Sequence, residues 1–206
     1  LDPDAVAQAV ASAEPEVIVH ELTALSGEMS ARAARHPDRS PMFAMTSRLR
    51  TEGTDHLLAA GQGVGARRFV AQSFAAFRFT RTGGPALGRT RLFPIIGDGG
   101  GGWSHVHVDD AAAATALAVD RGGSGIYNIV DDQPAPVREW PPALASALGA
   151  KPPRRIPRWL GRLAAGEAAT VVTTDVRGAS NEKAKRELGW QPRYASWRQG
   201  SAQGLG

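Results

Sequence analysis

The first part of the chain shows a helical pattern of apolar positions followed by a short continuous apolar run. Val6 and Val10 recur at helical spacing until Pro15, and Asp2 is placed to cap that helix ahead of a proline in its first turn. Residues 16–22, with the sequence EVIVHEL, are β-branched with little alternation. This composition is typical of a strand covered on both faces in a parallel sheet. The pattern predicts a helix and then a buried strand.

The same order of helix and strand recurs further along. Residues 52–60 carry a modest apolar stripe that predicts a helix, closed by a glycine-rich C-cap at residues 61–65. Residues 67–73, RRFVAQS, are predicted to form a second buried strand. Two such units in a row favour an α/β parallel sheet with right-handed crossovers. Between them, residues 26–47 are predicted to be mostly loop, with some helical character at residues 29–34.

A glycine- and proline-rich connection over residues 81–102 separates this region from the rest of the chain. Beyond it, residues 105–108 and 125–130 are predicted as short strands. Asp109-Asp110 directly precedes an alanine-rich run and is predicted to cap a helix there. Three further helices are expected, over residues 137–148, 158–169 and 181–188.

The composition of the chain mainly excludes certain kinds of partner and of functional site. The 206 residues are 42% hydrophobic and 21% charged, as in globular domains, and the 24 Lys+Arg against 20 Asp+Glu are not blocked into a patch. We therefore expect no nucleic-acid partner. The absence of cysteine excludes disulfides, thiolate catalysis and cysteine-bound metal centres. No apolar run approaches the ~18 residues of a membrane span and no leader pattern opens the sequence, so we expect a cytoplasmic protein with no membrane partner.

Two glycine-rich segments share features with nucleotide-binding loops. Gly61-x-Gly63-x-Gly65 follows a helix and precedes a strand, the reverse of the order in a dinucleotide fingerprint, and is interpreted as a helix C-cap. Residues 97–102 lack the Lys-Ser/Thr of a P-loop. A mobile connection or a hairpin is therefore favoured there over a phosphate cradle.

Histidines offer two candidate sites. His105, His107 and Asp109 would share one face of a strand, and imidazole with carboxylate suits a divalent metal. Helix capping explains the aspartate without a metal, so no metal site is predicted. His20 has no nucleophile placed beside it by the sequence, and a hydrogen-bonded core or strand-end histidine is favoured over a general base.

Hydroxyl side chains follow both predicted strands. Thr23 comes after the first strand and Ser73 ends the second. In open parallel sheets, ligands collect at the carboxyl ends of the strands. The alternative, that each hydroxyl only satisfies nearby backbone groups, stays open at this point.

Six segments, in order along the chain, carry a family resemblance: EPEVIVHELTA, RTEGTDHLLAA, ARRFVAQS, WSHVHVDDAAAATALAV, GIYNIVDDQPAPVREW and NEKAKRELGWQP. Together they resemble the NAD-dependent epimerase/dehydratase group of the extended short-chain dehydrogenase/reductase family. The resemblance implies a Rossmann sheet that binds NAD or NADP and a C-terminal lobe for a small-molecule substrate, often a nucleotide sugar. It also implies hydride transfer assisted by a Ser/Thr and by a Tyr-x-x-x-Lys pair, whose lysine lowers the tyrosine pKa.

Carried over by position, the resemblance implies that Leu22, Thr23 and Ala24 line the cofactor, together with Ser73 at the end of the next strand. Phe74 stands where the catalytic Ser/Thr is expected. The expected fold class is α/β, a partial Rossmann-like parallel sheet with a small α-rich C-terminal lobe. Its regions are residues 1–80 for the sheet, 81–102 for the connection and 103–206 for the substrate-lobe-like part.

Two motifs of the family are missing from this sequence. There is no Gly-x-x-Gly-x-x-Gly, and neither tyrosine is followed four residues later by lysine, since Tyr127 precedes Asp131 and Tyr194 precedes Arg198. The junction of RTGGPA with LGRTRLFPII falls where the tyrosine–lysine pair and the sixth strand would lie. We therefore predict no catalytic residue, weak NAD or NADP binding and no turnover by this chain alone.

The missing segments also affect stability and partners. Strands that the family buries between neighbours would have bare edges and apolar faces, which predicts marginal stability or association, for example as a homo-oligomer. The leading hypothesis is a shortened relative of an NAD(P)-dependent epimerase/dehydratase or reductase. The alternative is a non-catalytic binding or regulatory module derived from the same fold.

Overall fold

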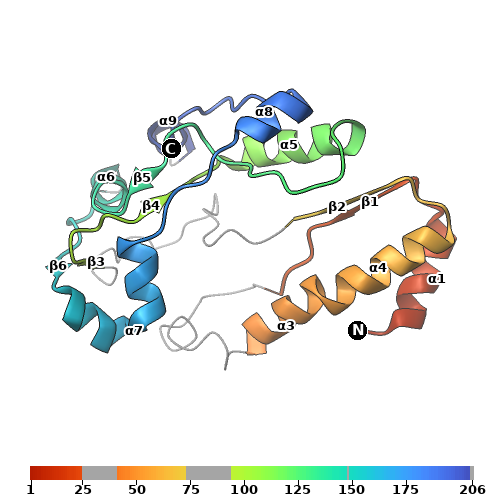
Figure 1. Cartoon of the computed structure of the whole chain (residues 1–206), viewed down its shortest axis with the longest axis horizontal. Coiled ribbons are helices and arrows are strands. Elements are labelled where there is room, and N and C mark those ends of the chain that lie inside the picture. The colour runs from red at the N-terminus through yellow and green to blue at the C-terminus, as the bar shows by residue number, and fades with distance from the viewer. Residues whose placement is uncertain (25–40, 73–93, 148, 205–206) are drawn as a thin grey trace. The chain divides into compact units, whose positions relative to one another are not determined.

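The computed structural model describes residues 1–24, 41–72, 94–147 and 149–204 (Figure 1). The chain divides into two compact units, Leu1–Ala76 and Phe77–Gly206, hereafter unit 1 and unit 2. Both contain helices and short strands. Within the described part of the chain, no helix combines the length and apolar character needed to cross a bilayer.

Unit 1 follows the predicted order of helix and strand. Its described elements are α1 (Pro3–Ala13), β1 (Val17–His20), α3 (Pro41–Arg50), α4 (Glu52–Gly63) and β2 (Arg68–Ala71). The two strands pair in parallel, with Val17 opposite Arg68 and His20 opposite Ala71 (Figure 1). The predicted parallel pairing of the two segments is confirmed.

The ends of α1 and α4 behave largely as their sequences predict. The Asp2 carboxylate caps α1 by accepting from the backbone N–H of Asp4 at 3.0 Å. The helix α4 continues three residues beyond the predicted end, and Gly65, at φ +74°, lies just past its last turn. Inside α4, a Cβ on Gly61 would lie 2.7 Å from Ile18 Cδ1, so a glycine is needed for α4 to pack closely on β1.

The prediction that the first strand is covered on both faces is wrong for β1. Ile18 and His20 are buried, whereas Val19 between them is 44% exposed. Alternating burial of this kind means that only one face of the strand packs against the rest of the protein. Among the described residues the sheet has two strands, so each strand has a hydrogen-bonded neighbour on one side.

The prediction of a mostly irregular segment over residues 26–47 fails at its end. The structure places a ten-residue helix, α3, at Pro41–Arg50. Pro41 suits a first helical turn, and Leu49 is a good helix former, but the apolar stripe of α3 is weak. Tertiary contacts stabilise such a helix, and sequence periodicity does not reveal them. Residues 29–34 lie outside the described part.

Unit 2 is mainly helical and holds two short strand pairs. Its described elements are β3 (Ile95–Ile96), β4 (Gly102–Trp103), α5 (Val108–Asp120), β5 (Ala135–Pro136), α6 (Trp140–Ala147), β6 (Arg155–Ile156), α7 (Arg158–Thr174), α8 (Glu182–Leu188) and α9 (Trp197–Gly204). The β3–β6 pair is parallel and the β4–β5 pair is antiparallel. The helices predicted over residues 137–148, 158–169 and 181–188 correspond to α6, α7 and α8, and α7 continues five residues beyond its predicted end, past a non-helical residue at Gly166.

Helix α5 begins at Val108, ahead of the predicted capping residues Asp109-Asp110, and a different side chain caps it. His107 is the N-cap residue, and its Nδ1 accepts from the N–H of Asp109 at 3.2 Å. The predicted strand over residues 105–108 does not form, since residues 105–107 are irregular and residue 108 begins the helix. Residues 125–130 form no strand either, although the N–H of Asp131 donates to the carbonyl of His105 at 2.6 Å.

The core of unit 2 joins α5 to α8. Ala114 of α5 packs with Leu188 of α8 and with Trp190 beyond it, and all three are buried. Asp110, in the first turn of α5, is also buried, and its carboxylate accepts from the N–H groups of Arg193 at 2.8 Å and Tyr194 at 2.9 Å. These bonds fix the chain that leads from α8 to α9.

Candidate functional site

The carboxyl ends of β1 and β2 meet at one edge of unit 1. Because the strands are parallel and in register, the residues that follow His20 and Ala71 leave the sheet side by side. The N–H of Gln72 donates to the carbonyl of His20 at 3.0 Å and extends this pairing by one residue. This edge is where open α/β sheets bind their ligands.

Helix α3 fastens both strand ends at this edge. Thr46 Oγ1 accepts from the N–H of Ala24 at 3.2 Å, and the carbonyl of Leu49 accepts from the His20 ring at 3.0 Å. Arg50 Nη1 donates to the carbonyl of Gln72, after β2, at 3.0 Å. Sequence reasoning missed these three residues of α3 because it assigned most of this helix to a loop.

The interpretation of His20 as a hydrogen-bonded core histidine is confirmed. Its side chain is almost completely buried, and its Nε2 lies 3.0 Å from the carbonyl of Leu49. A carbonyl only accepts, so Nε2 carries the proton and donates. His20 therefore holds β1 to α3, which explains its presence without a catalytic role.

Three of the four predicted cofactor-lining residues lie at this edge. Leu22 is 58% exposed, and Thr23 and Ala24 are half-buried. The bond from Ala24 to Thr46 fixes the backbone of this segment. Ser73, as well as Phe74, lies outside the described residues. The edge thus offers an exposed apolar side chain and a hydroxyl-bearing residue on an anchored backbone.

The glycine-rich segment over residues 97–102 is a connection, which was one of the two predicted alternatives, and the other alternative, a hairpin, is wrong. It joins β3 to β4, which pair with different strands. Each of its glycine N–H groups donates to an acceptor within unit 2: Gly97 to Ile156 O, Gly99 to Ile96 O, Gly100 to Asp98 Oδ1, Gly101 to Thr173 O and Gly102 to Val176 O. Since these five glycine donors are engaged within the fold, they are not available to cradle a phosphate.

The glycines at the end of α4 are likewise engaged. Gly65 donates to Gln62 O at 3.2 Å, and Ala66 donates to Gly61 O at 2.9 Å. Both bonds close the last turn of the helix, which confirms the C-cap interpretation of this segment.

Both tyrosines are held in contacts within unit 2. The Tyr127 hydroxyl lies 2.9 Å from the carbonyl of Gly123 and 3.0 Å from Glu187 Oε2, and donates toward these acceptors. The hydrogen bond from Arg186 is the largest cause that lowers the pKa of Glu187, so this acceptor is a carboxylate at neutral pH. The Tyr194 ring stacks on His107 with centroids 3.9 Å apart. Lys183 Nζ lies over the Tyr127 ring, 4.5 Å from its centroid, but this lysine is 56 residues from Tyr127 in sequence and does not form the Tyr-x-x-x-Lys pair of the family.

The proposed histidine–aspartate set does not share a face of a strand. His107 and Asp109 lie at the start of α5, where the imidazole caps the helix. His105 packs edge-on against Trp140, and burial lowers the pKa of His105 to about 4. Across the described residues, no group of three or more His, Cys, Asp or Glu side chains is placed to hold a metal ion.

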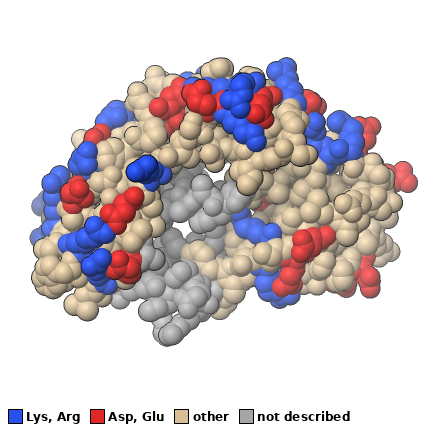
Figure 2. Space-filling view, in the orientation of Figure 1, with Lys and Arg blue, Asp and Glu red and all other residues tan. Residues whose placement is uncertain are grey.

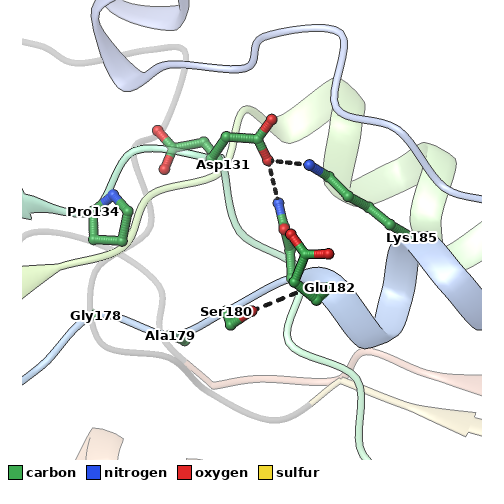
Figure 3. A pocket seen from close by; sticks show the side chains of 9 residues that line it. Asp131, Pro134, Gly178, Ala179, Ser180, Glu182 and Lys185 are labelled. Carbon is green, nitrogen blue, oxygen red and sulfur yellow. Dashed lines mark hydrogen bonds and ion pairs between the residues drawn. The ribbon is translucent and has the colours of Figure 1, made fainter.

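A cavity of about 520 Å³ in unit 2 is lined by Asp131, Asp132, Pro134, residues 178–182 and Lys185 (Figure 3). Asp132 Oδ1 accepts from Lys185 Nζ at 2.6 Å and from Asn181 Nδ2 at 2.7 Å. Burial raises the pKa of Asp132, but these two partners outweigh burial and lower it. Asn181, the N-cap residue of α8, and Lys185 are four residues apart, so the start of α8 binds this carboxylate.

Asp131 also lines this cavity, but its pKa is shifted in the opposite direction to that of Asp132. It is 3% exposed, and its Oδ1 accepts from the N–H of Gln133 at 3.3 Å. Burial raises the pKa of Asp131 to about 6. The neighbouring carboxylates therefore titrate in different pH ranges, and sequence reasoning assigned no role to either.

Comparison with known proteins identifies the class. No protein-family model matches the chain. A 3-diazoavenalumate denitrifying reductase from a Streptomyces species is 35% identical over 259 residues, which cover 97% of this chain and 83% of the relative.

Solved structures share the fold over nearly the whole chain. A Thermotoga maritima UDP-glucose 4-epimerase with UDP-glucose matches with a TM-score of 0.67 and 18% identity, over 99% of this chain and 80% of the epimerase. The Thermus thermophilus UDP-glucose 4-epimerase in complex with NAD matches with a TM-score of 0.63 and 17% identity, over 99% of this chain and 81% of the epimerase. A Pseudomonas aeruginosa protein, RMD, complexed with NADPH, matches with a TM-score of 0.56 and 17% identity, over 99% of this chain and 84% of RMD.

Reductase and epimerase relatives together define an α/β class with a partial Rossmann-like fold, as predicted. The chain belongs to the NAD-dependent epimerase/dehydratase group of the extended short-chain dehydrogenase/reductase family.

Proposed function

We propose that this chain derives from a nicotinamide-dependent reductase or epimerase, and that the carboxyl edge of β1 and β2 is the part of the cofactor site that it retains. The observation that supports this most directly is the anchoring of both strand ends by α3, through Thr46, Leu49 and Arg50. An anchored strand end presents its following residues in a defined geometry, as ligand binding requires.

The proposed cofactor is NAD or NADP, since solved relatives of this fold contain NAD or NADPH. Leu22, Thr23 and Ala24 would line it on β1, and Ser73 would line it after β2. Leu22 fits this role because its side chain is exposed at the edge. When bound, the cofactor would supply hydride transfer.

The described residues do not provide a site for the pyrophosphate. Both glycine-rich segments in the described part use their N–H groups within the fold, and the sequence has no Gly-x-x-Gly-x-x-Gly. The match to the reductase spans 259 residues whereas the chain has 206, so the relative carries residues within the matched region that this chain lacks. Weak dinucleotide binding and no turnover by this chain alone follow from this proposal.

The proposed substrate class is a small molecule with a carbonyl or alcohol group, such as a sugar nucleotide. The 35% identity to a reductase favours reduction over epimerisation. The named epimerases are below 20% identical, which supports a common fold and no particular substrate.

Titration calorimetry with NADH and with NADPH tests the proposal, with the Streptomyces reductase as a reference. A dissociation constant in the micromolar range for this chain would contradict weak binding. Amide shifts in NMR spectra locate the weak contact, and NADH is expected to shift residues 22–24. Leu22→Glu should abolish these shifts, whereas Leu58→Glu, at a less exposed leucine on α4, should leave them. NADH-induced shifts confined to other residues would refute the assignment of this edge.

A second candidate function is a non-catalytic binding module. Val19 and Leu22 expose apolar surface at the sheet, at 44% and 58%, and such surface favours association with a partner or a second copy. Light scattering after size exclusion tests this candidate. A monomer at all concentrations, with no binding of an apolar dye, would argue against it.

A further inference from the structure

An exposed face of unit 2 combines arginines with apolar side chains where β6 leads into α7. We call it the α7 patch, and its residues are Arg154, Arg155, Arg158, Trp159, Arg162 and Leu163. Trp159 is 66% exposed and Leu163 is 79% exposed, although both are large and apolar. Figure 2 shows Lys and Arg side chains, interspersed with carboxylates, over this end of unit 2.

Helical spacing brings the apolar and cationic side chains together. Trp159 and Leu163 are one turn apart on α7, and Arg158 and Arg162 immediately precede them in sequence. The opposite face of α7 packs inward, where Gly161 lies against Ile96 of β3. The apolar pair therefore points away from the core of unit 2.

The arginines of the patch give it a net positive charge. Arg158 pairs with Asp175, and Arg162 Nε lies 2.7 Å from Glu167 Oε2, but all four side chains are exposed. Exposed ion pairs are weak and open readily. The side chains of Arg154 and Arg155 are exposed and form no ion pair with a described carboxylate. Arg155 lies three residues before Arg158, within about 10 Å along the chain, so these charges act on the same surface.

We propose that the α7 patch docks reversibly on an anionic phospholipid surface. Basic side chains beside exposed Trp and Leu on one helical segment are the composition of interfacial helices. Indole rings prefer the headgroup level of a bilayer, and each cation close to an anionic membrane strengthens binding about fivefold. With two apolar side chains and no lipid anchor, the attachment is weak and reversible.

The shape of the patch favours a lipid surface over a protein partner. Its apolar part consists of two side chains that protrude from a helix. A stable protein interface buries roughly 1,200–2,000 Å² and seats its aromatic anchors in pockets. Protruding apolar side chains flanked by arginines instead suit insertion between headgroups. This inference goes beyond the proposed function and does not depend on cofactor binding. It departs from the expectation of no membrane partner, which rested on the lack of a spanning run and a leader pattern and did not consider surface docking.

Flotation of the whole chain with vesicles tests the proposal. Binding is expected to vesicles of phosphatidylglycerol and phosphatidylcholine but not to phosphatidylcholine alone, and added salt should weaken it. Arg154→Gln combined with Arg155→Gln should lower the partition coefficient about 25-fold. Trp159→Ser combined with Leu163→Ser should lower it about tenfold or more. Two controls alter exposed residues elsewhere. Ile126→Ser is the control for the apolar pair, and the double variant Arg67→Gln with Arg186→Gln is the control for the arginine pair. The partition coefficient of each control should stay within about twofold of that of the unmodified chain.

Several results would overturn the proposal. These are equal binding to both kinds of vesicle, no binding to anionic vesicles at low salt, or binding that neither pair of patch substitutions reduces. Binding of polyglutamate without any vesicle binding, lost with the Arg154 and Arg155 substitutions, would also overturn it and indicate an acidic protein partner. Circular dichroism of each variant verifies that the fold is retained.

Discussion

Replacing Asp110 with alanine tests how unit 2 holds its C-terminal elements. The carboxylate of Asp110 is buried in the first turn of α5 and accepts from the N–H groups of Arg193 and Tyr194, at 2.8 and 2.9 Å. The Trp190 indole donates to the Asp110 carbonyl at 3.0 Å, and the substitution leaves this bond in place. The variant therefore removes the side-chain bonds and leaves two donors unsatisfied.

The expected loss follows from the nature of these bonds. A hydrogen bond to a charged group contributes about 1.5–3 kcal/mol to stability, and a carboxylate in a first helical turn adds about 0.5 kcal/mol. Because the two donors are only partly buried, water compensates in part. We expect Asp110→Ala to lower the free energy of unfolding of unit 2 by about 3 kcal/mol, and Asp110→Asn, which can still accept one bond, by about half as much.

Urea unfolding followed by tryptophan fluorescence measures this loss, since all five tryptophans lie in unit 2. The signal is therefore independent of unit 1, which matters because two units need not unfold in one transition. Asp109→Ala is the matched control, at a half-exposed carboxylate in the same turn, and should cost less than about 1 kcal/mol. Equal losses for the two alanine variants would refute the role assigned to Asp110.

Three further predictions concern Asp131, Gly99 and Thr46. The pKa of Asp131 is raised to about 6 in the folded protein, so the folded state binds its proton more tightly than the unfolded chain, and stability is lost as pH rises from about 4 to 6. Asp131→Asn should gain about 2–3 kcal/mol relative to the unmodified chain between pH 4 and 7, and a pH-independent difference in urea unfolding would contradict this. Gly99→Ala should cost more than about 2 kcal/mol, because Gly99 has φ +62° and its Cβ would lie 2.9 Å from Arg138 N. Gly149→Ala, also at φ +62° but in open space, isolates the backbone strain at about 1 kcal/mol, and equal melting temperatures for the two variants would contradict the close packing of Gly99. Thr46→Val should accelerate hydrogen exchange at the Ala24 amide about fivefold by removing its acceptor, whereas Thr51→Val, at the exposed residue between α3 and α4, should leave that amide unchanged.

Local signals predicted the parts of the fold that depend on neighbours in sequence. The cap of α1 needs only Asp2 and the N–H groups that follow it, and the end of α8 needs only Gly189 in a left-handed conformation. Residues 125–130 have strand composition, but a strand also needs a paired partner. The carbonyl of His105 binds the chain just after this segment, at Asp131, and no ladder follows. Composition alone therefore predicted a strand at residues 125–130 that does not form.

The candidate site shows the same division between local and long-range information. The position of Thr23 after a strand was readable from sequence, because strand ends follow from the apolar run. The role of Thr46 was not, since its partner Ala24 is 22 residues away. One signal of helical structure here is the Arg48–Glu52 pair, four residues apart and 2.8 Å from nitrogen to oxygen, which joins the last turn of α3 to the first residue of α4. A pair of this kind supports a helix even where the apolar stripe is weak.

The contacts of α3 also decide how unit 1 responds to perturbation. All three of its bonds to the sheet reach groups at the carboxyl edge, the His20 ring and the backbone of Ala24 and Gln72. The pairing of β1 with β2 does not use these groups, apart from the bond between Gln72 and His20. Loosening α3 should therefore disorder residues 22–24 before it separates the strands. Dinucleotide contacts at this edge would then be lost in variants whose strand pairing is intact, which separates a defect in the site from a defect in folding.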